Sequence, residues 1–225
     1  MTLFTPSYKR HRFPSEIIAL AVWLYHRFNL SFREVEEMLL ERGIDVSYET
    51  VRRWVAKFGP AIARGLRRRQ PSPGDAWHLD EVRVKIGRDR FWLWRAVDQD
   101  GIVLDEVLQR RRDKRAARRL LTKLLKKHGA IPKRFITDKL QSYGAAKREL
   151  VPGIEHRSHK GLNNRAENSH LPFRKRERAM QGFRSPGGLQ RFLSAFSAIR
   201  NCFSVPARRR SAQTIRYHRL EAFDT

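Results

Sequence analysis

Cysteine, acidic residues and long apolar runs are all scarce in this 225-residue sequence. The single cysteine, Cys202, excludes an internal disulfide framework and is typical of a reducing compartment. The longest uninterrupted apolar stretch, residues 17–25, falls well short of the ~18 residues that a membrane span requires. Residues 1–12 contain no apolar run that would indicate a signal peptide. We therefore expect a cytoplasmic protein without membrane partners.

Basic residues are abundant in the sequence. The 48 lysines and arginines outnumber the 23 acidic residues and give a formal net charge of +25. Such an imbalance indicates a polyanionic partner, and nucleic acid is the first candidate. The hydrophobic fraction of 40%, with five tryptophans and thirteen phenylalanines, is sufficient for a substantial core and argues against general disorder.

The first sixty residues predict three helices. The first begins after Pro14 and has apolar residues at helical spacing. Residues 31–34, SFRE, form a capping box that opens the second helix, which ends at Gly43. Ser47 is a favourable N-cap for the third helix, which we expect to end at residues 59–60, Gly-Pro.

Two helices joined by a tight glycine-containing turn, after a supporting helix, are typical of a helix-turn-helix motif. In that motif the N-terminal residues of the second helix meet base edges, and nearby basic groups meet phosphates. The alternative is an ordinary three-helix bundle with a basic face, but the overall charge favours DNA. The predicted DNA-contacting residues of the third helix are Glu49, Thr50, Arg52, Arg53 and Lys57.

A composition change marks the boundary between two predicted domains. Residues 64–75, RGLRRRQPSPGD, combine a basic run with a Pro-Ser-Pro-Gly segment that is typical of a linker. Within it, Arg67, Arg68 and Arg69 are candidates for tracking a phosphate backbone. The predicted organisation is a helix-turn-helix domain (1–62), a linker (63–75), a second domain (76–204) and a basic C-terminal tail (205–225).

The second domain is predicted to have an α+β fold with a mixed sheet. Residues 77–87 alternate in the two-residue period of a half-buried strand, and further strands joined by short turns follow. A strand that follows a meander and a helix most often lies beside the first strand, so we expect residues 134–137 there. The remaining predictions are strands at 91–97 and 102–108, helices at 113–129, 140–150 and 163–178 with an interruption at Pro172, an extended segment at 156–159, and a final helix from Pro186.

Three acidic residues stand in unusual settings for so basic a chain. Asp80 lies within the first strand, Asp138 ends the apolar strand RFIT, and Glu167 lies in NNRAENSH. Each alone is explained by a solvated or ion-paired acid, but together they suggest a carboxylate triad that holds metal. Two hard cations held by carboxylates provide what phosphodiester chemistry requires, and clustered acids repel one another unless metal is present.

Other residues near these acids have simpler interpretations. Glu81, Asp98 and Asp100 are expected to be turn or surface acids. Trp77 and the aromatic residues of the segment 91–94 are expected in the core, with stacking on unpaired bases as the alternative. His78 shares a strand face with Asp80 and either lines the site or fills a gap in the core.

The strings HLDEV, FITDK, WRAVDQDG and LNNRAENSH resemble the DDE transposases of bacterial insertion sequences, above all the insertion-sequence six family. The resemblance implies a helix-turn-helix followed by a ribonuclease-H-like catalytic domain that is shared with retroviral integrases. It also implies metal-binding, catalytic roles for Asp80, Asp138 and Glu167, with Mg²⁺ as the cofactor and Mn²⁺ able to substitute. A basic residue seven positions after the glutamate is typical of the family, and Arg174 fits as a DNA contact.

The function expected from this resemblance is DNA transposition by a nucleoid-associated homodimer or larger homo-oligomer. The protein would bind the inverted repeats that end its element, cleave there to leave 3′-hydroxyls, and join these to target DNA. The alternatives are a non-enzymatic helix-turn-helix regulator and a nuclease without strand transfer. The third acid could also be Glu149, Glu155 or Glu177, but the small polar neighbours of Glu167 favour it.

Overall fold

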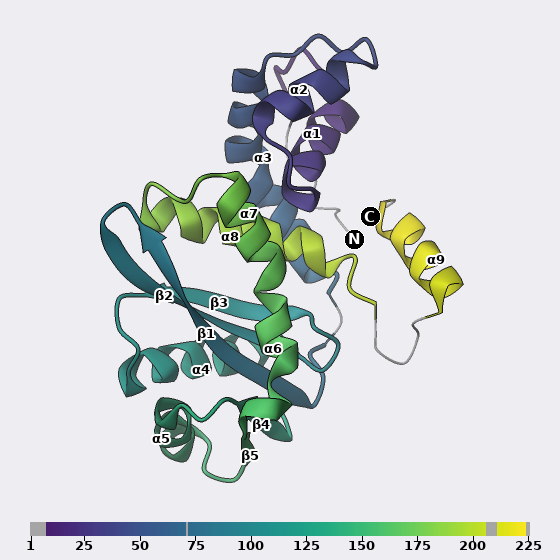
Figure 1. Ribbon diagram of the computed structural model, residues 1–225. Helices are drawn as coiled ribbons and strands as arrows, with labels where there is room; N and C mark the ends of the chain where they lie inside the picture. The colour runs from purple at the N-terminus through teal and green to yellow at the C-terminus, as the bar shows by residue number, and fades with distance from the viewer. Residues whose placement is uncertain (1–7, 71, 206–210, 224–225) are drawn as a thin grey trace.

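The computed structural model describes residues 8–70, 72–205 and 211–223. A helical N-terminal unit sits on a sheet with helices on both faces, and a C-terminal helix stands apart (Figure 1). Within the described chain, no helix is both long and apolar enough to cross a membrane. The N-terminal helices are α1 (Ser15–Arg27), α2 (Phe32–Leu40) and α3 (Tyr48–Arg68).

The N-terminal helices begin at the predicted caps. Ser31 forms the complete capping box with Glu34, and Ser47 accepts a hydrogen bond from the backbone of Thr50 at the start of α3. Gly43 adopts a φ of 70°, the left-handed conformation that glycine tolerates best, in the turn between α2 and α3. The three predicted N-terminal helices and the glycine-containing turn between the second and third are thus present.

The predicted end of the third helix was wrong. Instead of ending at residues 59–60, α3 continues through Pro60 to Arg68. An interior proline costs about 3 kcal/mol or more in a helix. Here packing offsets that cost, because the second half of α3 buries Ala63 against Ala195 and Ala198 of α8.

The sheet is mixed and has the order β3-β2-β1-β4-β5. The first three strands pair antiparallel, whereas β4 and β5 run parallel to β1. The prediction that the fourth strand lies beside the first is confirmed, since Leu79 of β1 pairs with Thr137 of β4. The strands are β1 (Ala76–Ile86), β2 (Asp89–Asp98), β3 (Val103–Gln109), β4 (Arg134–Thr137) and β5 (Glu155–Ser158).

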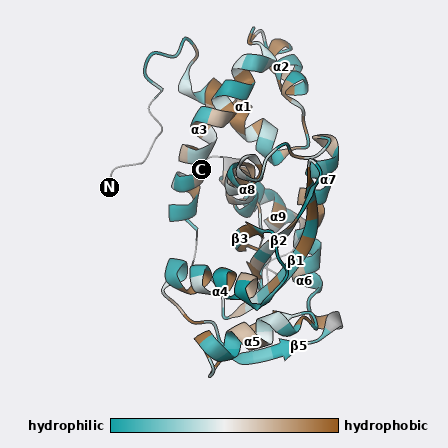
Figure 2. Cartoon of the chain, turned by 90° about the vertical axis from the view of Figure 1, so that its left-hand side faces the viewer, coloured by the Kyte–Doolittle hydropathy of each residue, from teal (hydrophilic) through white to brown (hydrophobic). Residues whose placement is uncertain are grey.

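Helices cover both faces of the sheet, and apolar residues are concentrated between these layers (Figures 1 and 2). Trp77 and Leu79 of β1 pack toward α4, whereas Val84 and Ile86 pack toward the layer of α7 and α8. The remaining elements are α4 (Lys114–His128), α5 (Gln141–Leu150), η1 (Lys160–Leu162), α6 (Asn164–Ser169), α7 (Leu171–Ala179), α8 (Pro186–Asn201) and α9 (Ala212–Phe223).

The N-terminal unit is attached to the sheet and its helices through α7 and α8. The buried guanidinium of Arg176 in α7 donates to the carbonyl oxygens of Phe28 and Leu30, just beyond α1, and lies 4.1 Å from the ring centroid of Tyr25. The predicted interruption at Pro172 occurs as a break between α6 and α7. The predicted basic tail includes helix α9, and residues 206–210 of that tail lie outside the described residues.

Candidate active site

Three carboxylates meet at the edge of the sheet where β4 ends. Asp80 and Glu81 are adjacent on β1, and Asp138 immediately follows β4. One oxygen of each lies within 4.8 Å of the others. The prediction for Glu81 was wrong, because its side chain is only 1% exposed. The Cβ of Glu81 leaves β1 on the face opposite that of Asp80, yet its carboxylate lies beside those of Asp80 and Asp138 and is covered rather than solvated.

Burial sets the electrostatics of these acids. Loss of hydration raises the pKa of Asp80 to about 6, and the neighbouring Asp138 acts in the same direction. Burial likewise raises the pKa of Glu81 to about 7, against the opposing effect of Arg112. Buried carboxyl groups are costly to ionise unless a positive charge lies beside them. A hard divalent cation such as Mg²⁺ supplies that charge and prefers oxygen ligands, so this cluster fits it.

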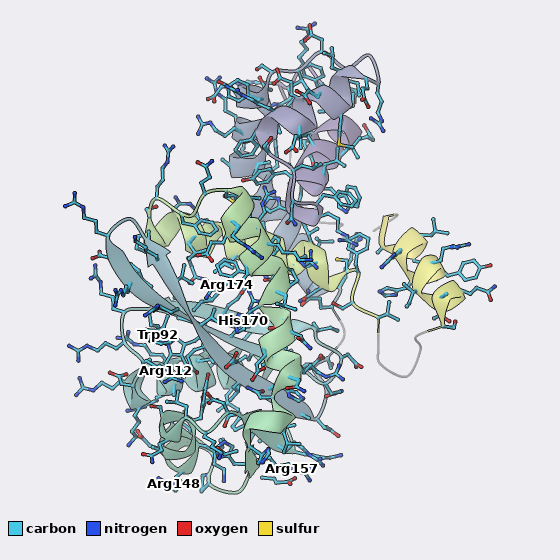
Figure 3. The ribbon with its side chains drawn as sticks, in the orientation of Figure 1. Trp92, Arg112, Arg148, Arg157, His170 and Arg174 are labelled. Atoms are coloured by element: carbon cyan, nitrogen blue, oxygen red, sulfur yellow. The ribbon has the colours of Figure 1, made fainter. Side chains whose placement is uncertain are left out.

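An arginine already neutralises one of the three acids. Arg112 donates from Nε to Glu81 Oε1 at 2.7 Å, and its Nη2 lies 2.6 Å from the same oxygen and 3.6 Å from Asp138 Oδ2. The guanidinium also lies 5.1 Å from the ring centroid of Trp92 (Figure 3). The structure thus pairs Glu81 internally and leaves Asp80 and Asp138 with charge that is less fully compensated.

Helix α6 packs directly over Asp80. Asn163, its N-cap, donates from Nδ2 to the Leu79 carbonyl at 2.8 Å, and His170 Nε2 lies 3.4 Å from Asp80 Oδ2. Burial, with Arg95 nearby, lowers the pKa of His170 well below its usual range, so a neutral imidazole faces the acid. Glu167 follows Asn163 by about one helical turn and flanks this contact face. It is exposed, and its carboxylate is not among the three that converge.

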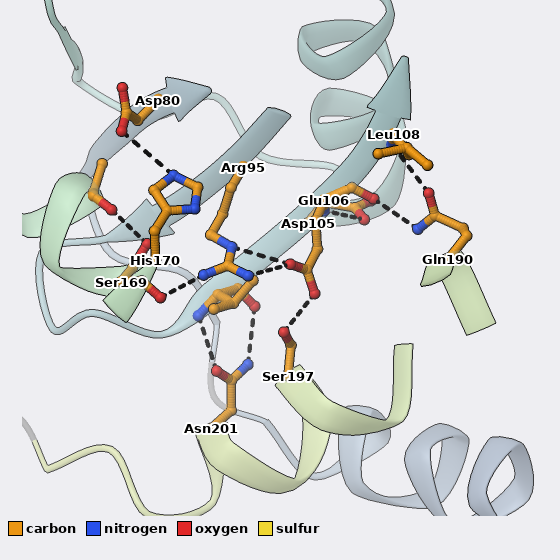
Figure 4. Close-up of polar contacts among 12 residues, drawn as sticks. Asp80, Arg95, Asp105, Glu106, Leu108, Ser169, His170, Gln190, Ser197 and Asn201 are labelled. Carbon is orange, nitrogen blue, oxygen red and sulfur yellow. Dashed lines mark hydrogen bonds and ion pairs between the residues drawn. The ribbon is translucent and has the colours of Figure 1, made fainter. Parts of the chain in front are cut away.

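A buried ion pair holds the end of α6 (Figure 4). Arg95 of β2, whose side chain is 2% exposed, lies 2.7 Å from Glu106 of β3 and donates to the carbonyl of Ser169. Ser197 of α8 donates in turn to Glu106. The network joins the sheet, α8 and the residue that precedes His170. Sequence reasoning missed Arg95, although a charged residue in the apolar strand FWLWRAV was a usable signal.

The comparisons with known proteins identify the family of this chain. A family model described as a DDE domain, of the IS240 transposase type, matches residues 74–205, more than half of the chain. The chain belongs to the DDE transposase family. DDE transposases are polynucleotidyl transferases, so the predicted enzyme class is confirmed.

Two curated relatives from Staphylococcus aureus support the assignment. This DDE transposase is 31% identical over 179 residues to the transposase for insertion sequence-like element IS431mec, covering 77% of this chain and 80% of the relative. It is 30% identical, over the same shares, to the transposase for insertion sequence element IS257 in transposon Tn4003. The predicted membership of the insertion-sequence six family is confirmed.

Two solved structures show weaker likenesses. One is a chain of the simian T-cell lymphotropic virus intasome in complex with PP2A regulatory subunit B56 gamma (19% identity, TM-score 0.44, 58% of this chain and 50% of that chain). The other is the HTLV-2 integrase catalytic core domain in complex with magnesium (16% identity, TM-score 0.33, 50% and 86%). The mixed sheet with helices on both of its faces confirms the predicted α+β fold.

On the predicted base-reading face of α3, the basic residues Arg52, Arg53 and Lys57 are exposed, whereas Glu49 and Thr50 are half-buried. Glu49 pairs there with Arg52 at 2.6 Å and with Arg53 at 3.5 Å. Lys57 Nζ lies 2.9 Å from His11 Nε2, and the hydroxyl of Thr50 lies 3.0 Å from that of Ser47. Their DNA contacts remain predictions.

The other predicted DNA contacts of the transposase have different surroundings. Arg67 turns inward and donates to the backbone and hydroxyl oxygens of Ser194 in α8, so it serves packing between α3 and α8. Arg68 and Arg69 are exposed. Arg174 of α7 donates to the carbonyl of Arg83 in β1 at 2.6 Å and is paired with Glu177 at 2.6 Å.

Proposed function

We propose that this DDE transposase binds the inverted repeats at the ends of its own insertion sequence, cleaves one strand at each end, and joins the resulting 3′-hydroxyls to target DNA. The observation that carries the proposal is the convergence of Asp80 and Asp138 at one sheet edge in a chain of net charge +25. Acids gathered beside a DNA-binding surface repel phosphate unless they hold a cation.

We assign the metal-holding role to Asp80, Asp138 and Glu167, with Mg²⁺ as the ion and Mn²⁺ able to substitute. Such an ion, when bound, activates a nucleophile and neutralises charge on the phosphodiester. Glu81 is the competing third ligand, but its carboxylate is nearly inaccessible and is already paired with Arg112. Glu167 is exposed on the flank of α6 and has no such partner among the described residues.

The surrounding residues orient these acids and the DNA. Neutral His170 lies against Asp80 Oδ2 without competing as a cation, and Asn163 fixes α6 to the β1 backbone at Leu79. The exposed face of α3 reads the terminal repeat, and Arg68 and Arg69 bind the adjacent phosphates. Because two ends must be joined in one event, the active species is a homodimer or a larger homo-oligomer.

The test uses the DNA that flanks the gene. A duplex carrying the terminal repeat is incubated with the full chain and Mg²⁺, and both nicked and joined products are measured. Asp80→Asn and Asp138→Asn are expected to eliminate both products while binding is retained or strengthened, because a negative charge near phosphate is lost. Asp75→Asn, at an exposed acid paired with Lys133, is the matched control and should retain activity.

Two outcomes would contradict the proposal. Full nicking by Asp80→Asn would remove the assigned role of the acids. Nicked DNA without any joined product would favour a nuclease that lacks strand transfer.

A further inference from the structure

The β1–β2 hairpin extends past the end of β4 and carries exposed cations. Pairing between β1 and β4 stops at Leu79, whereas β1 continues to Ile86. Within the ranges that the structure describes, no carboxylate lies within ion-pair distance of these basic side chains. The hairpin cations are Arg83, Lys85, Arg88 and Arg90.

The arrangement of these residues is electrostatically unfavourable in the isolated protein. Lys85 and Arg90 are paired directly across the two antiparallel strands, so their side chains share a face. Like charges in this position destabilise a sheet. Asp89, the acid of the hairpin, does not neutralise these cations, because its carboxylate is paired with Arg110 at 3.4 Å. A bound polyanion would relieve the repulsion.

The hairpin cations line an open groove of about 820 Å³ together with Arg174 and Glu177 of α7. The charge of Glu177 is neutralised by Arg174, which also donates to the Arg83 carbonyl and so fastens α7 to the edge of the hairpin. The groove therefore has a strong net positive charge. Its floor is rigid, because backbone pairing fixes β1 and β2 in register.

The groove lies along β1 beyond the carboxylate cluster, since its first lining residue on this strand, Arg83, follows Glu81 by two positions. Glu81, Arg83 and Lys85 are every second residue of β1, so they share one face of the strand. Successive residues of a strand are about 3.3 Å apart along its axis. The cations thus extend on the order of 13 Å from the acids, the length of about four base pairs of duplex. In a duplex cut at the carboxylate cluster, the phosphates of the next few base pairs would fall within this distance.

We propose that the hairpin cations form a binding surface for the sugar–phosphate backbone of duplex DNA beside the cleavage point. The inference rests on the proposed function, since the DNA bound here is the DNA cleaved at Asp80. The contacts are to phosphate and are independent of sequence. The surface extends the predicted DNA contacts of α3, because it holds the segment that must reach the acids.

The test compares two variants of the full chain that each lose three positive charges. The first is Arg83→Gln/Lys85→Gln/Arg90→Gln, and the second removes three exposed cations of α4 that do not line the groove. This control is Arg115→Gln/Arg119→Gln/Lys126→Gln. Binding is measured in EDTA across a salt series, on a terminal-repeat duplex and on a random duplex, and hydroxyl-radical footprints are recorded.

The hairpin variant is expected to bind both duplexes at least about tenfold more weakly, and its slope of log K against log salt should fall by about two to three. Its footprint should shorten on one side of the cleavage point. The control should change affinity less than about threefold. Equal losses for the two variants, or an unshortened footprint, would overturn the proposal. If the triple variant fails to fold, Lys85→Gln alone should lower the slope by about one.

The experiments distinguish a failure of the hairpin surface from a failure of the proposed function. Normal binding by the hairpin variant, with cleavage lost in Asp80→Asn, would refute the surface alone. Loss of binding by the hairpin variant, with full cleavage by Asp80→Asn, would refute the role of the acids alone.

Discussion

Two charged regions of this transposase differ in how their charge is neutralised. On the exposed face of α3, Glu49 pairs with Arg52 and Arg53 of the same helix, and a hydrogen bond from Arg52 lowers the pKa of Glu49. At the sheet edge, Asp80 and Asp138 converge from two strands, and burial raises the pKa of Asp80 to about 6. The acid of the first region is neutralised by arginines of its own helix, whereas the acids of the second lack enough positive charge beside them.

The difference indicates where chemistry takes place. Exposed ion pairs contribute little to stability and are common on any surface. Buried acids brought close together are costly, and strongly perturbed carboxylates of this kind are concentrated at functional sites. We therefore expect the chemistry at the sheet edge, where Asp80 and Asp138 converge, rather than on α3.

The largest expected effect separates Glu167 from the other glutamates. Glu167→Gln should lower Mg²⁺-dependent cleavage on the order of 1000-fold, because a metal-holding carboxylate contributes several kcal/mol to transition-state stabilisation. Glu177→Gln is the matched control, since Glu177 is paired with Arg174 and should retain most activity. Single-turnover cleavage of end DNA measures both. The reverse pattern, in two folded proteins, would move the catalytic helix from α6 to α7.

The second prediction concerns the ion pair that holds α6. Arg95→Met should lower the free energy of unfolding by about 3–5 kcal/mol, because Glu106 would be left buried and unpaired. Denaturant melts measure this loss. Arg110→Met, at an exposed arginine 3.4 Å from Asp89, should cost less than about 0.5 kcal/mol. Similar losses for the two variants would show that the Arg95 pair does not hold the site together.

The fold was largely predictable from local signals. Ser31, Ser47 and Asp113 are the observed N-caps of α2, α3 and α4, and the place of β4 follows from the preference for a returning strand to lie beside the first. The course of α3 through Pro60 was not predictable locally. Burial of Ala63 against α8 decides it, and that contact joins residues far apart in the sequence.

The site was predictable in part. The adjacency of Asp80 and Asp138 followed from strand pairing, because each lies at the same level of two neighbouring parallel strands. Glu81 was misjudged, because strand alternation gives only the direction of its Cβ and does not show that its carboxylate joins the cluster and is covered there. Arg112, in the loop before α4, covers and pairs with Glu81. No rule of sequence spacing connects Arg112 with Glu81.

The third prediction tests the cost of the buried acid directly. The folded state holds the Asp80 proton more tightly than the unfolded state, whose pKa is near 3.8. The free energy of unfolding should therefore fall as pH rises from about 4 to about 6, by at most about 3 kcal/mol. In EDTA, Asp80→Asn should flatten this decline, as measured by thermal melts across pH. Asp75→Asn, at an exposed acid, should leave the decline unchanged.

The smallest expected effect lies on α3. Arg53→Ala should weaken binding to the terminal repeat more than binding to random DNA, because a base contact discriminates by ~1–3 kcal/mol, whereas a phosphate contact weakens all sequences alike. The loss should fall near 1 kcal/mol, at the low end of that range, since Arg53 must leave Glu49 before it reaches a base. Competition gel shifts on the two duplexes measure the difference. Equal losses would make Arg53 a phosphate contact, and Glu49→Gln, which frees the arginine, should then strengthen binding to both DNAs.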